Sequence, residues 1–277
     1  MRKITAKNDT NIQNLIRSTF PQLGGGVLRR AFEKKDIKIN SVRCSQASAL
    51  VKQGDVVEVF IDDKYLFPKL DIVYSDERLV IIDKPQGMET QGEFGAEGVL
   101  SKQIEKAVFP VHRLDATTGG LLIFALDEPM QHALENAIKE KTVSKYYRCV
   151  VKGRPKAASG KLEDYLFKDA KRSLSYVCAP NKPGAQKALL EYRVIENRKD
   201  TSLLEIKLIT GRTHQIRVQT AHAGFPLLGD DKYGDRDFNR RLNKIKPQLC
   251  AVRLIFEEKS GELAYLFGKT ISIKAPF

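Results

Sequence analysis

Residues 111–125 join a polar loop to an uninterrupted apolar run, and this junction is the strongest constraint on the fold. The segment reads Val-His-Arg-Leu-Asp-Ala-Thr-Thr-Gly-Gly-Leu-Leu-Ile-Phe-Ala. Its Thr-Thr-Gly-Gly stretch predicts a turn, and the run from Leu121 to Ala125 predicts a buried strand directly after that turn. We therefore expect Asp115 on a tight loop at the mouth of a rigid element, where a sheet can present a reactive group.

Asp115 has two interpretations on these residues alone. As a reactive carboxylate, it would be kept ionised by Arg113, while the glycines would let a substrate approach the backbone. As an Asx-turn residue, it would accept hydrogen bonds from the amides of Thr117 or Thr118, and Arg113 would form a surface salt bridge. The loop by itself leaves both interpretations open.

The length and composition favour one large domain and a smaller one. The chain has 277 residues, 42% of them hydrophobic, which is ample for a sizeable core. No apolar run is long enough to span a membrane and the N-terminus has no apolar signal core, so we expect a cytoplasmic protein without a membrane partner. The four cysteines lie far apart and suggest neither a disulfide framework nor a zinc cluster.

The charge balance predicts a polyanionic partner. Lysine and arginine number 47 against 34 aspartate and glutamate residues, which gives a net charge of +13. Neutralising phosphates supplies most of the non-specific affinity for nucleic acids, so RNA or DNA is the expected partner class. Charge alone says nothing about chemistry.

Residues 1–65 are predicted to form a small basic module, with 12 lysine and arginine residues against 7 acidic ones. The pattern predicts helices over 11–20 and 27–35, separated by a break at 21–26, and strands over 37–40 and 56–60. This order, with the Gly-Asp-Val-Val-Glu-Val closure, resembles the S-four-type RNA-binding module. The second helix carries the candidate RNA-binding residues Arg29, Arg30, Lys34 and Lys35, which would otherwise be a solvated basic face.

After a predicted linker at 62–69, residues 66–277 are expected to form a strand-rich α+β domain. A helix is predicted from Asp127 to about Lys141, and a strand over 145–151 that turns Tyr147 inward, where it would ordinarily be a packing residue. A hairpin is expected within 157–188. Lys84 is expected to be a solvated strand end, with a phosphate contact as the alternative.

A second glycine turn at Gly211 leads into a predicted helix, with Thr213 as its N-cap. On this helix Arg217 could reach back over the helix start, or it could be a surface phosphate contact together with Arg212. His214 and His222 lie eight residues apart with no third ligand nearby, so the pattern predicts no metal site.

Several motifs in a fixed order resemble the RluA family of RNA pseudouridine synthases. They are His-Arg-Leu-Asp with Thr-Thr-Gly-Gly at 112–120, Lys-Tyr-Tyr at 145–147, Gly-Arg-Thr-His-Gln-Ile-Arg at 211–217, and Gly-Asp with Tyr-Gly at 229–234. Lys-Pro-Gln-Gly at 84–87 and the Ala-Pro-Phe ending fit the same family. The chain departs from it at Gly119, because members more often have Ser-Gly and then Leu at 118–120, and at Gln219, where many have histidine.

The resemblance implies a mixed, largely antiparallel catalytic domain and a uridine-isomerising activity that needs no metal and no cofactor. It makes Asp115 the nucleophile, or a base towards the sugar. Arg217 would pair with Asp115, and Tyr147 would sit against the base and assist the last proton removal. Arg113 would help to extrude the uridine. We expect His112, Arg212 and His214 to contact RNA as well.

The resemblance favours a monomeric enzyme acting on large-subunit ribosomal RNA, with transfer RNA as the second possibility. One rival hypothesis is a non-catalytic RNA-binding or ribosome-assembly protein, in which Asp115 and the arginines serve structure only. Another is a hydrolase that uses Asp115 as an acid, although no partner carboxylate lies in a recognisable motif.

Overall fold

The computed structural model describes residues 1–20, 23–62, 65 and 69–277, which form two compact units. The first unit comprises Met1–Leu70 and Gly87–Lys106, and the second comprises Asp71–Gln86 and Ala107–Phe277. Parts of the predicted break at 21–26 and of the predicted linker at 62–69 lie outside the described residues. No helix in the described part of the chain is long and apolar enough to cross a membrane.

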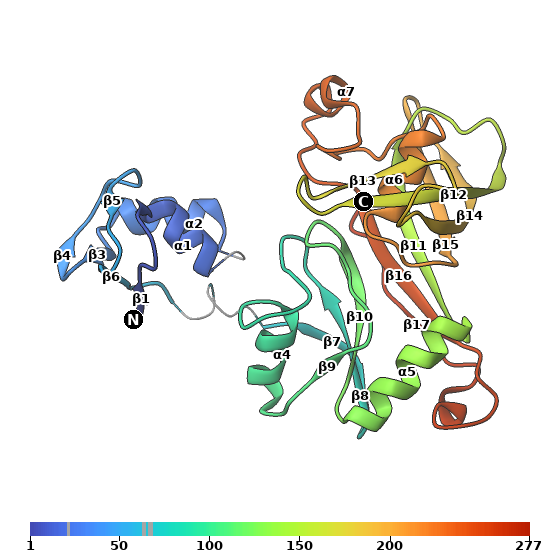
Figure 1. Ribbon diagram of the computed structural model, residues 1–277, viewed down its shortest axis with the longest axis horizontal. Coiled ribbons are helices and arrows are strands. Elements are labelled where there is room, and N and C mark those ends of the chain that lie inside the picture. Colours follow the sequence, from blue (N-terminus) through green and yellow to red (C-terminus); the bar gives the residue numbers. More distant parts are fainter. Residues whose placement is uncertain (21–22, 63–64, 66–68) are drawn as a thin grey trace. The chain divides into compact units, whose positions relative to one another are not determined.

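The first unit packs two helices against a small antiparallel sheet (Figure 1). Both predicted helices are confirmed, and Asn11 caps the first of them by accepting a hydrogen bond from the Asn14 amide at 2.8 Å. The core between helices and sheet contains Ile12, Ile16 and Val57. The elements are β1 (Arg2–Thr5), β2 (Thr10–Asn11), α1 (Ile12–Thr19), α2 (Gly25–Glu33), β3 (Ile37–Ile39), β4 (Val42–Arg43), β5 (Leu50–Val51) and β6 (Val56–Val59).

Helix α4 (Ala96–Ile104) belongs to the first unit as well. The Phe94 ring meets the Phe20 ring edge-on at 5.1 Å between centroids, and the Gln103 side chain bonds the Leu70 backbone at both its amide and its carbonyl. The grouping therefore differs from the expected boundary between residues 65 and 66, because residues 87–106 join the N-terminal segment.

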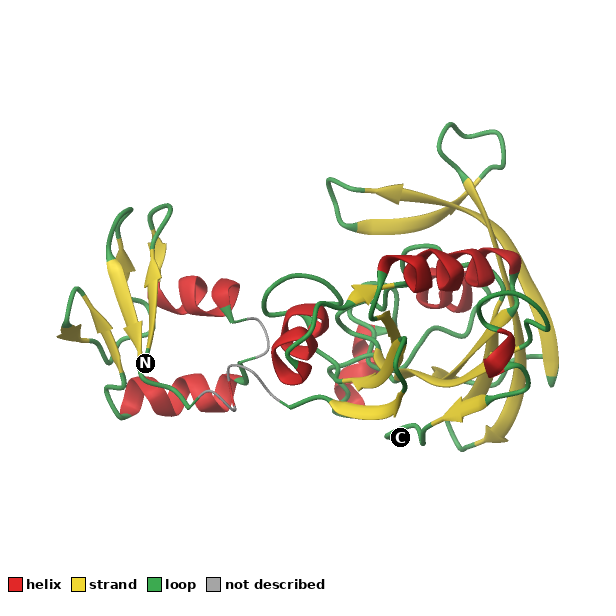
Figure 2. Cartoon of the chain, turned by 90° about the horizontal axis from the view of Figure 1, so that it is seen from below, coloured by secondary structure: helices red, strands yellow, loops and turns green. Residues whose placement is uncertain are grey.

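The second unit is built on one long, curved sheet (Figure 2). Its strand order is β13-β12-β14-β15-β11-β16-β10-β8-β7, and all neighbours run antiparallel except β10 and β16. The predicted α+β class with a largely antiparallel sheet is thus confirmed. The strands are β7 (Asp71–Ser75), β8 (Leu79–Lys84), β9 (Phe109–Pro110), β10 (Gly119–Ala125), β11 (Val143–Lys152), β12 (Ser159–Asp169), β13 (Leu174–Cys178), β14 (Gln186–Asn197), β15 (Thr201–Leu208), β16 (Leu249–Phe256) and β17 (Thr270–Ser272).

Helices α5 (Glu128–Glu140) and α6 (Gln215–His222) cover different parts of this sheet. Helix α5 packs on β10 and β11, and α6 packs on β12 and β13. The α5 helix begins where the sequence predicts, because the Asp127 side chain accepts a hydrogen bond from the Met130 amide at 2.6 Å. A third helix, α7 (Arg236–Arg241), adds Phe238 to a separate apolar cluster with Val150 and Leu203.

Two local predictions are wrong. The N-cap of α6 is His214 rather than Thr213, and its backbone is left-handed with φ 57°. Lys84 is fully buried instead of solvated, and its Nζ donates to the Pro85 carbonyl at 3.1 Å. Gly120, the second residue of β10, has φ 108°, and a Cβ atom there would lie 2.2 Å from the Ala251 carbonyl oxygen. Only glycine permits this backbone conformation and the close approach of β16.

Candidate active site

A pocket of about 530 Å³ lies over β11, between the C-terminal end of α5 and the N-terminal end of α6. Its volume is within the range of ordinary small-ligand pockets. Basic side chains predominate among the charged groups of its wall, and the carboxylate there is that of Asp115. The charged and titratable lining residues are His112, Arg113, Asp115, Lys139, Lys141, Lys145, Tyr147, Arg212, His214 and Arg217.

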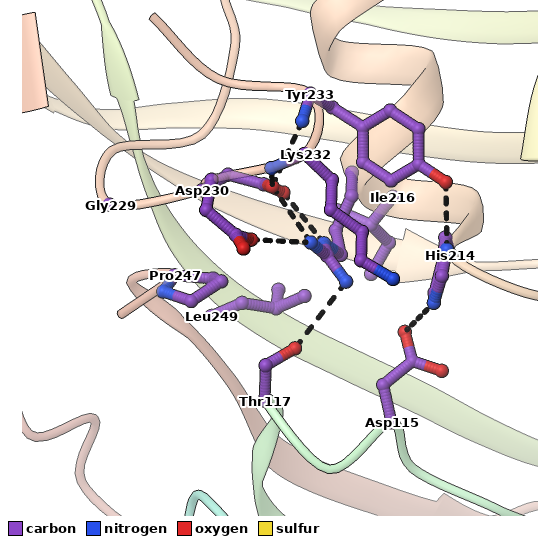
Figure 3. A network of polar contacts seen from close by, with 12 residues as sticks. Asp115, Thr117, His214, Ile216, Gly229, Asp230, Lys232, Tyr233, Pro247 and Leu249 are labelled. Carbon is purple, nitrogen blue, oxygen red and sulfur yellow. Dashed lines mark hydrogen bonds and ion pairs between the residues drawn. The ribbon is translucent and has the colours of Figure 1, made fainter. Parts of the chain in front are cut away.

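Asp115 sits at the start of a tight turn with its side chain free of that turn. The bond that closes the turn runs from the Thr118 amide to the backbone carbonyl of Asp115 at 2.9 Å. The carboxylate is one-fifth exposed and points toward His214, whose Nε2 is 3.9 Å from Oδ2 (Figure 3). Among the described residues, the Asx-turn bonds to the amides of Thr117 or Thr118 are not formed. The turn therefore holds the carboxylate outward, into the pocket.

His214 is oriented by a chain of hydrogen bonds that starts at the sheet. The Ser175 amide donates to the Tyr233 hydroxyl at 2.8 Å, and this hydroxyl lies 2.7 Å from Nδ1 of His214. Burial lowers the pKa of His214, and the charge of Arg217 lowers it further against the attraction of Asp115, so the ring is neutral near pH 7. Tyr233 then donates its proton to Nδ1, and we assign the ring proton to Nε2, which faces Asp115.

Arg217 is almost completely buried and forms a two-pronged ion pair with Asp230. Its Nε lies 2.6 Å and its Nη2 2.7 Å from the two carboxylate oxygens of Asp230. Its Nη1 donates to Thr117 Oγ1 at 3.4 Å, which connects the pair to the Asp115 turn. The expected direct pairing of Arg217 with Asp115 is therefore wrong for this structure, as is a surface phosphate role for this side chain. Arg217 supports the turn through its hydrogen bond to Thr117, and its charge interacts with that of Asp115.

Asp230 owes its charged state to this arginine. Burial alone would raise the pKa of the Asp230 carboxyl, but the hydrogen bond and the charge of Arg217 outweigh that effect. The amides of Lys232 and Tyr233 also donate to Oδ1, so the net pKa is below the ordinary value. Such a fully satisfied buried pair makes a rigid support.

Tyr147 and Lys145 project from β11 on the same side, since successive odd positions of a strand share a face. Tyr147 is 5% exposed, and burial, with the charge of Asp115, raises the pKa of its hydroxyl far above neutral pH. Its hydroxyl is therefore a neutral hydrogen-bonding group. Burial lowers the pKa of Lys145 to about 8. The ammonium of Lys145 lies 3.9 Å from the place where a Cβ on Gly211 would be, in the loop after β15.

The other predicted RNA contacts are divided between the two units. His112 lines the pocket, but its Nε2 accepts a hydrogen bond from the Ile123 amide, and burial together with Lys145 lowers its pKa to about 3. Arg113 and Arg212 are exposed at the pocket, and Arg212 Nε donates to the Lys187 carbonyl at 3.1 Å. The first unit holds the exposed side chains Arg29, Arg30, Lys34 and Lys35, on or directly after α2.

Sequence reasoning gave no site role to Lys145, Asp230 or Tyr233. For Lys145 a signal was present, because a residue two positions before an inward-facing Tyr147 lies on the same side of the strand. Asp230 and Tyr233 stand within a noted motif, but their partners at 217 and 214 become neighbours only through folding. Among the described residues, no group of three or more His, Cys, Asp or Glu side chains could hold a metal ion.

The two departures noted in the sequence have defined places. Gly119 is buried at the start of β10, and a Cβ there would lie 3.2 Å from Gln86 Cγ and 3.3 Å from the Lys84 carbonyl, so the position is tight. Gln219 is fully buried, donates to Asp164 Oδ2 at 2.8 Å and accepts from Gln215 at 3.0 Å. Its amide ties α6 to β12.

Comparison with known proteins identifies a family. Residues 78–222 match the family model described as RNA pseudouridylate synthase. "Ribosomal large subunit pseudouridine synthase C" of Vibrio cholerae is 32% identical over 82% of this chain and 78% of its own length. The protein of the same name from Rickettsia conorii is 29% identical over 95% of this chain and 97% of its own.

Solved structures agree on the fold. "Human RNA Pseudouridylate Synthase Domain Containing 4" superposes with a TM-score of 0.62 over 74% of this chain and 88% of that one, at 24% identity. "Human RNA Pseudouridylate Synthase Domain Containing 1" gives 0.61 over 76% and 84%, at 21% identity. The family match spans both the Asp115 turn and the Arg217 helix. The chain belongs to the RNA pseudouridylate synthase family.

Proposed function

We propose that this enzyme converts uridine to pseudouridine in large-subunit ribosomal RNA, with Asp115 as the nucleophile at the ribose. The observation that carries the proposal is the pocket, in which a carboxylate is held outward by a glycine-rich turn among basic side chains. Relatives similar to this chain over most of both lengths are named as large-subunit pseudouridine synthases, which favours this RNA as the substrate.

The reaction is an isomerisation and needs no net gain or loss of atoms. The bond between ribose C1′ and uracil N1 breaks, C1′ joins uracil C5, the proton on C5 leaves, and N1 gains a proton. Asp115 would attack C1′ as the base departs and would be released when C5 takes its place. A carboxylate that forms no turn hydrogen bonds of its own is free to do this.

The remaining pocket residues have supporting roles in this proposal. Arg113, exposed at the rim, would take the place of the extruded uridine in the RNA stack. Tyr147 would lie against the flipped base as a neutral phenol, since its raised pKa opposes the loss of its own proton. Arg217 would keep the turn in position through Thr117. The exposed cations after and along α2 would contact RNA phosphates.

The test is tritium release from RNA labelled at uracil C5, taken from cells that lack this protein. Wild-type enzyme should release tritium from large-subunit ribosomal RNA. Asp115→Asn should lower the rate at least about 1,000-fold, because the amide is a poor nucleophile, while the Kd for RNA changes by less than about threefold. Asp200→Asn, in an exposed turn between β14 and β15, is the matched control and should be fully active.

Each other outcome has a definite meaning. Release from transfer RNA alone would overturn the proposed substrate, and free uracil as product would indicate a hydrolase. Absence of release from every RNA fraction, with tight binding intact, would leave a binding protein. Loss of RNA binding in Asp115→Asn would make this residue structural.

A further inference from the structure

In the described part of the chain, Lys145 is a partly buried cation without a protein partner, in the wall of the pocket that contains Asp115. Within the described residues its ammonium forms no hydrogen bond, ion pair or ring contact. Other buried or half-buried cations of this unit do have partners. Examples are Arg217 with Asp230, Arg148 and Arg253 with Glu205, Lys152 with Asp235, and Lys84 with the Pro85 carbonyl. Burying an unpaired charge costs free energy, so the ammonium is expected to have a partner in the working complex.

The position of the ammonium limits what this partner can be. Lys145 stands two residues before Tyr147 on β11, and both side chains line the pocket that contains Asp115. Its Nζ ends beside Gly211, in the loop that follows the neighbouring strand β15. A group bound between Asp115 and Tyr147 is therefore within the space that Lys145 also faces. In the proposed function, from which this inference starts, that group is the uracil ring.

The reaction supplies the negative charge that such a cation would bind. When the bond from C1′ to N1 breaks, its electron pair stays on the detached uracil and is shared between N1 and the two carbonyl oxygens. A fixed donor aimed at charge that develops in the transition state is worth far more than one that binds the ground state equally. Asp115 and Tyr147, which would hold the ring between them, are a carboxylate and a neutral phenol and provide no positive charge for this purpose.

We propose that Lys145 is a catalytic residue that donates a hydrogen bond to a carbonyl oxygen of the departing uracil and stabilises its negative charge. Lys145 keeps its proton throughout, and no covalent bond to it forms. Its role is electrostatic and begins when the base detaches from the sugar.

The test compares Lys145→Met with Lys145→Arg in single-turnover tritium release. The enzyme is in excess over the RNA, at a concentration that saturates RNA binding. Lys145→Met keeps the length of the side chain and should slow the reaction about 100-fold, as the loss of one such donor does, while the Kd for RNA stays within about threefold. Lys145→Arg should recover most of the rate. Lys207→Met is the matched control, since Lys207 is a half-buried lysine of the neighbouring strand β15 that lies over the Tyr146 ring, and it should react at the wild-type rate.

The pH profile provides a second measurement that a purely structural role would not affect. The charged and titratable groups facing Lys145 are Asp115, His112 and Arg113 from the loop before β10, Tyr147 from β11, Lys139 and Lys141 from the end of α5, and Arg212, His214 and Arg217 from the start of α6. Burial puts the pKa values of His112 and His214 below the ordinary histidine value and that of Tyr147 above the ordinary tyrosine value.

Lys145, with a pKa of about 8, is therefore expected to control the rate between pH 7 and 10. The wild-type rate should fall about tenfold per unit above pH 8, toward the rate of Lys145→Met, and that variant should show no such decrease. A weakened Kd with an unchanged saturated rate would show instead that Lys145 binds an RNA phosphate, and would overturn the proposal. Unchanged rates would overturn it as well. Inactivity of the wild-type enzyme would refute the proposed function itself.

Discussion

The two faces of strand β11 differ in whether their charged side chains have protein partners. On the pocket face, neither the Lys145 ammonium nor the Tyr147 hydroxyl has a hydrogen-bond partner among the described residues. On the other face, Arg148 lies 3.8 Å from Glu205, a nearly buried carboxylate that also contacts Arg193 at 3.0 Å and Arg253 at 3.2 Å.

Alternation along one strand thus separates stability from function. Tyr146, on the paired face, is covered by the Arg253 guanidinium at 4.2 Å, so even its aromatic ring is engaged. The unpaired groups of the pocket face are the ones we assign to substrate. Polar groups that bind a substrate must lack protein partners before the substrate arrives, and this lowers the stability of the folded state. Three measurements test this difference.

The largest change in the free energy of unfolding is expected where the buried ion pair of Arg217 and Asp230 is broken. Asp230→Asn leaves the buried Arg217 without its carboxylate and should lower the free energy of unfolding by about 3 kcal/mol at pH 7. The pKa of Asp230 is lower in the folded state, so its contribution is present above the ordinary aspartate range and is lost as pH falls through the folded value.

Urea unfolding of wild type and Asp230→Asn at pH 7, 5 and 3 measures this effect, and the difference between them should shrink in acid. Asp237→Asn, in an exposed pair with Arg240, is the control and should change little. A loss below about 1 kcal/mol for Asp230→Asn would mean that the Arg217 charge is satisfied elsewhere.

A gain of stability is expected where an unpaired charge is removed. Burial lowers the pKa of Lys145 to about 8 in the folded state, so folding is penalised below that pH and the penalty is relieved as pH rises toward the unfolded value. Lys145→Met should therefore be more stable than wild type by about 1–2 kcal/mol at pH 7. Thermal unfolding should show the difference disappearing near pH 10. A destabilised variant at pH 7 would mean that the ammonium is already paired.

A smaller loss of stability than that of Asp230→Asn is expected on the paired face. Glu205→Gln removes the shared carboxylate of three arginines, which should cost about 1–2 kcal/mol, because these side chains are 32% to 66% exposed and water screens their repulsion. Activity per folded molecule should not change. Glu191→Gln breaks an exposed pair with Lys161 in the same sheet and is expected to cost less than about 0.5 kcal/mol. Equal costs for both variants would remove the distinction between the two faces.

Local patterns predicted much of the fold. Helix α5 was predictable from Asp127 and from apolar residues at helical spacing, and β10 from its apolar run, because both signals depend on near neighbours in the chain. The N-cap of α6 was mistaken because threonine is a good cap, whereas the Gln215 side chain bonds back to Thr210 and the Arg212 amide and holds His214 in a left-handed conformation.

The position of Asp115 on a turn followed from the sequence, but its partners did not. The family, the class of fold, the basic charge and the turn that presents Asp115 could all be predicted from the sequence, since they depend on short motifs and composition. Tertiary structure decided which charges are paired. Arg217 meets Asp230 across 13 residues and Glu205 binds arginines from three other strands, while Lys145 has no partner in the part of the chain that the structure describes. Pair distances depend on strand register and helix packing, which no local pattern contains.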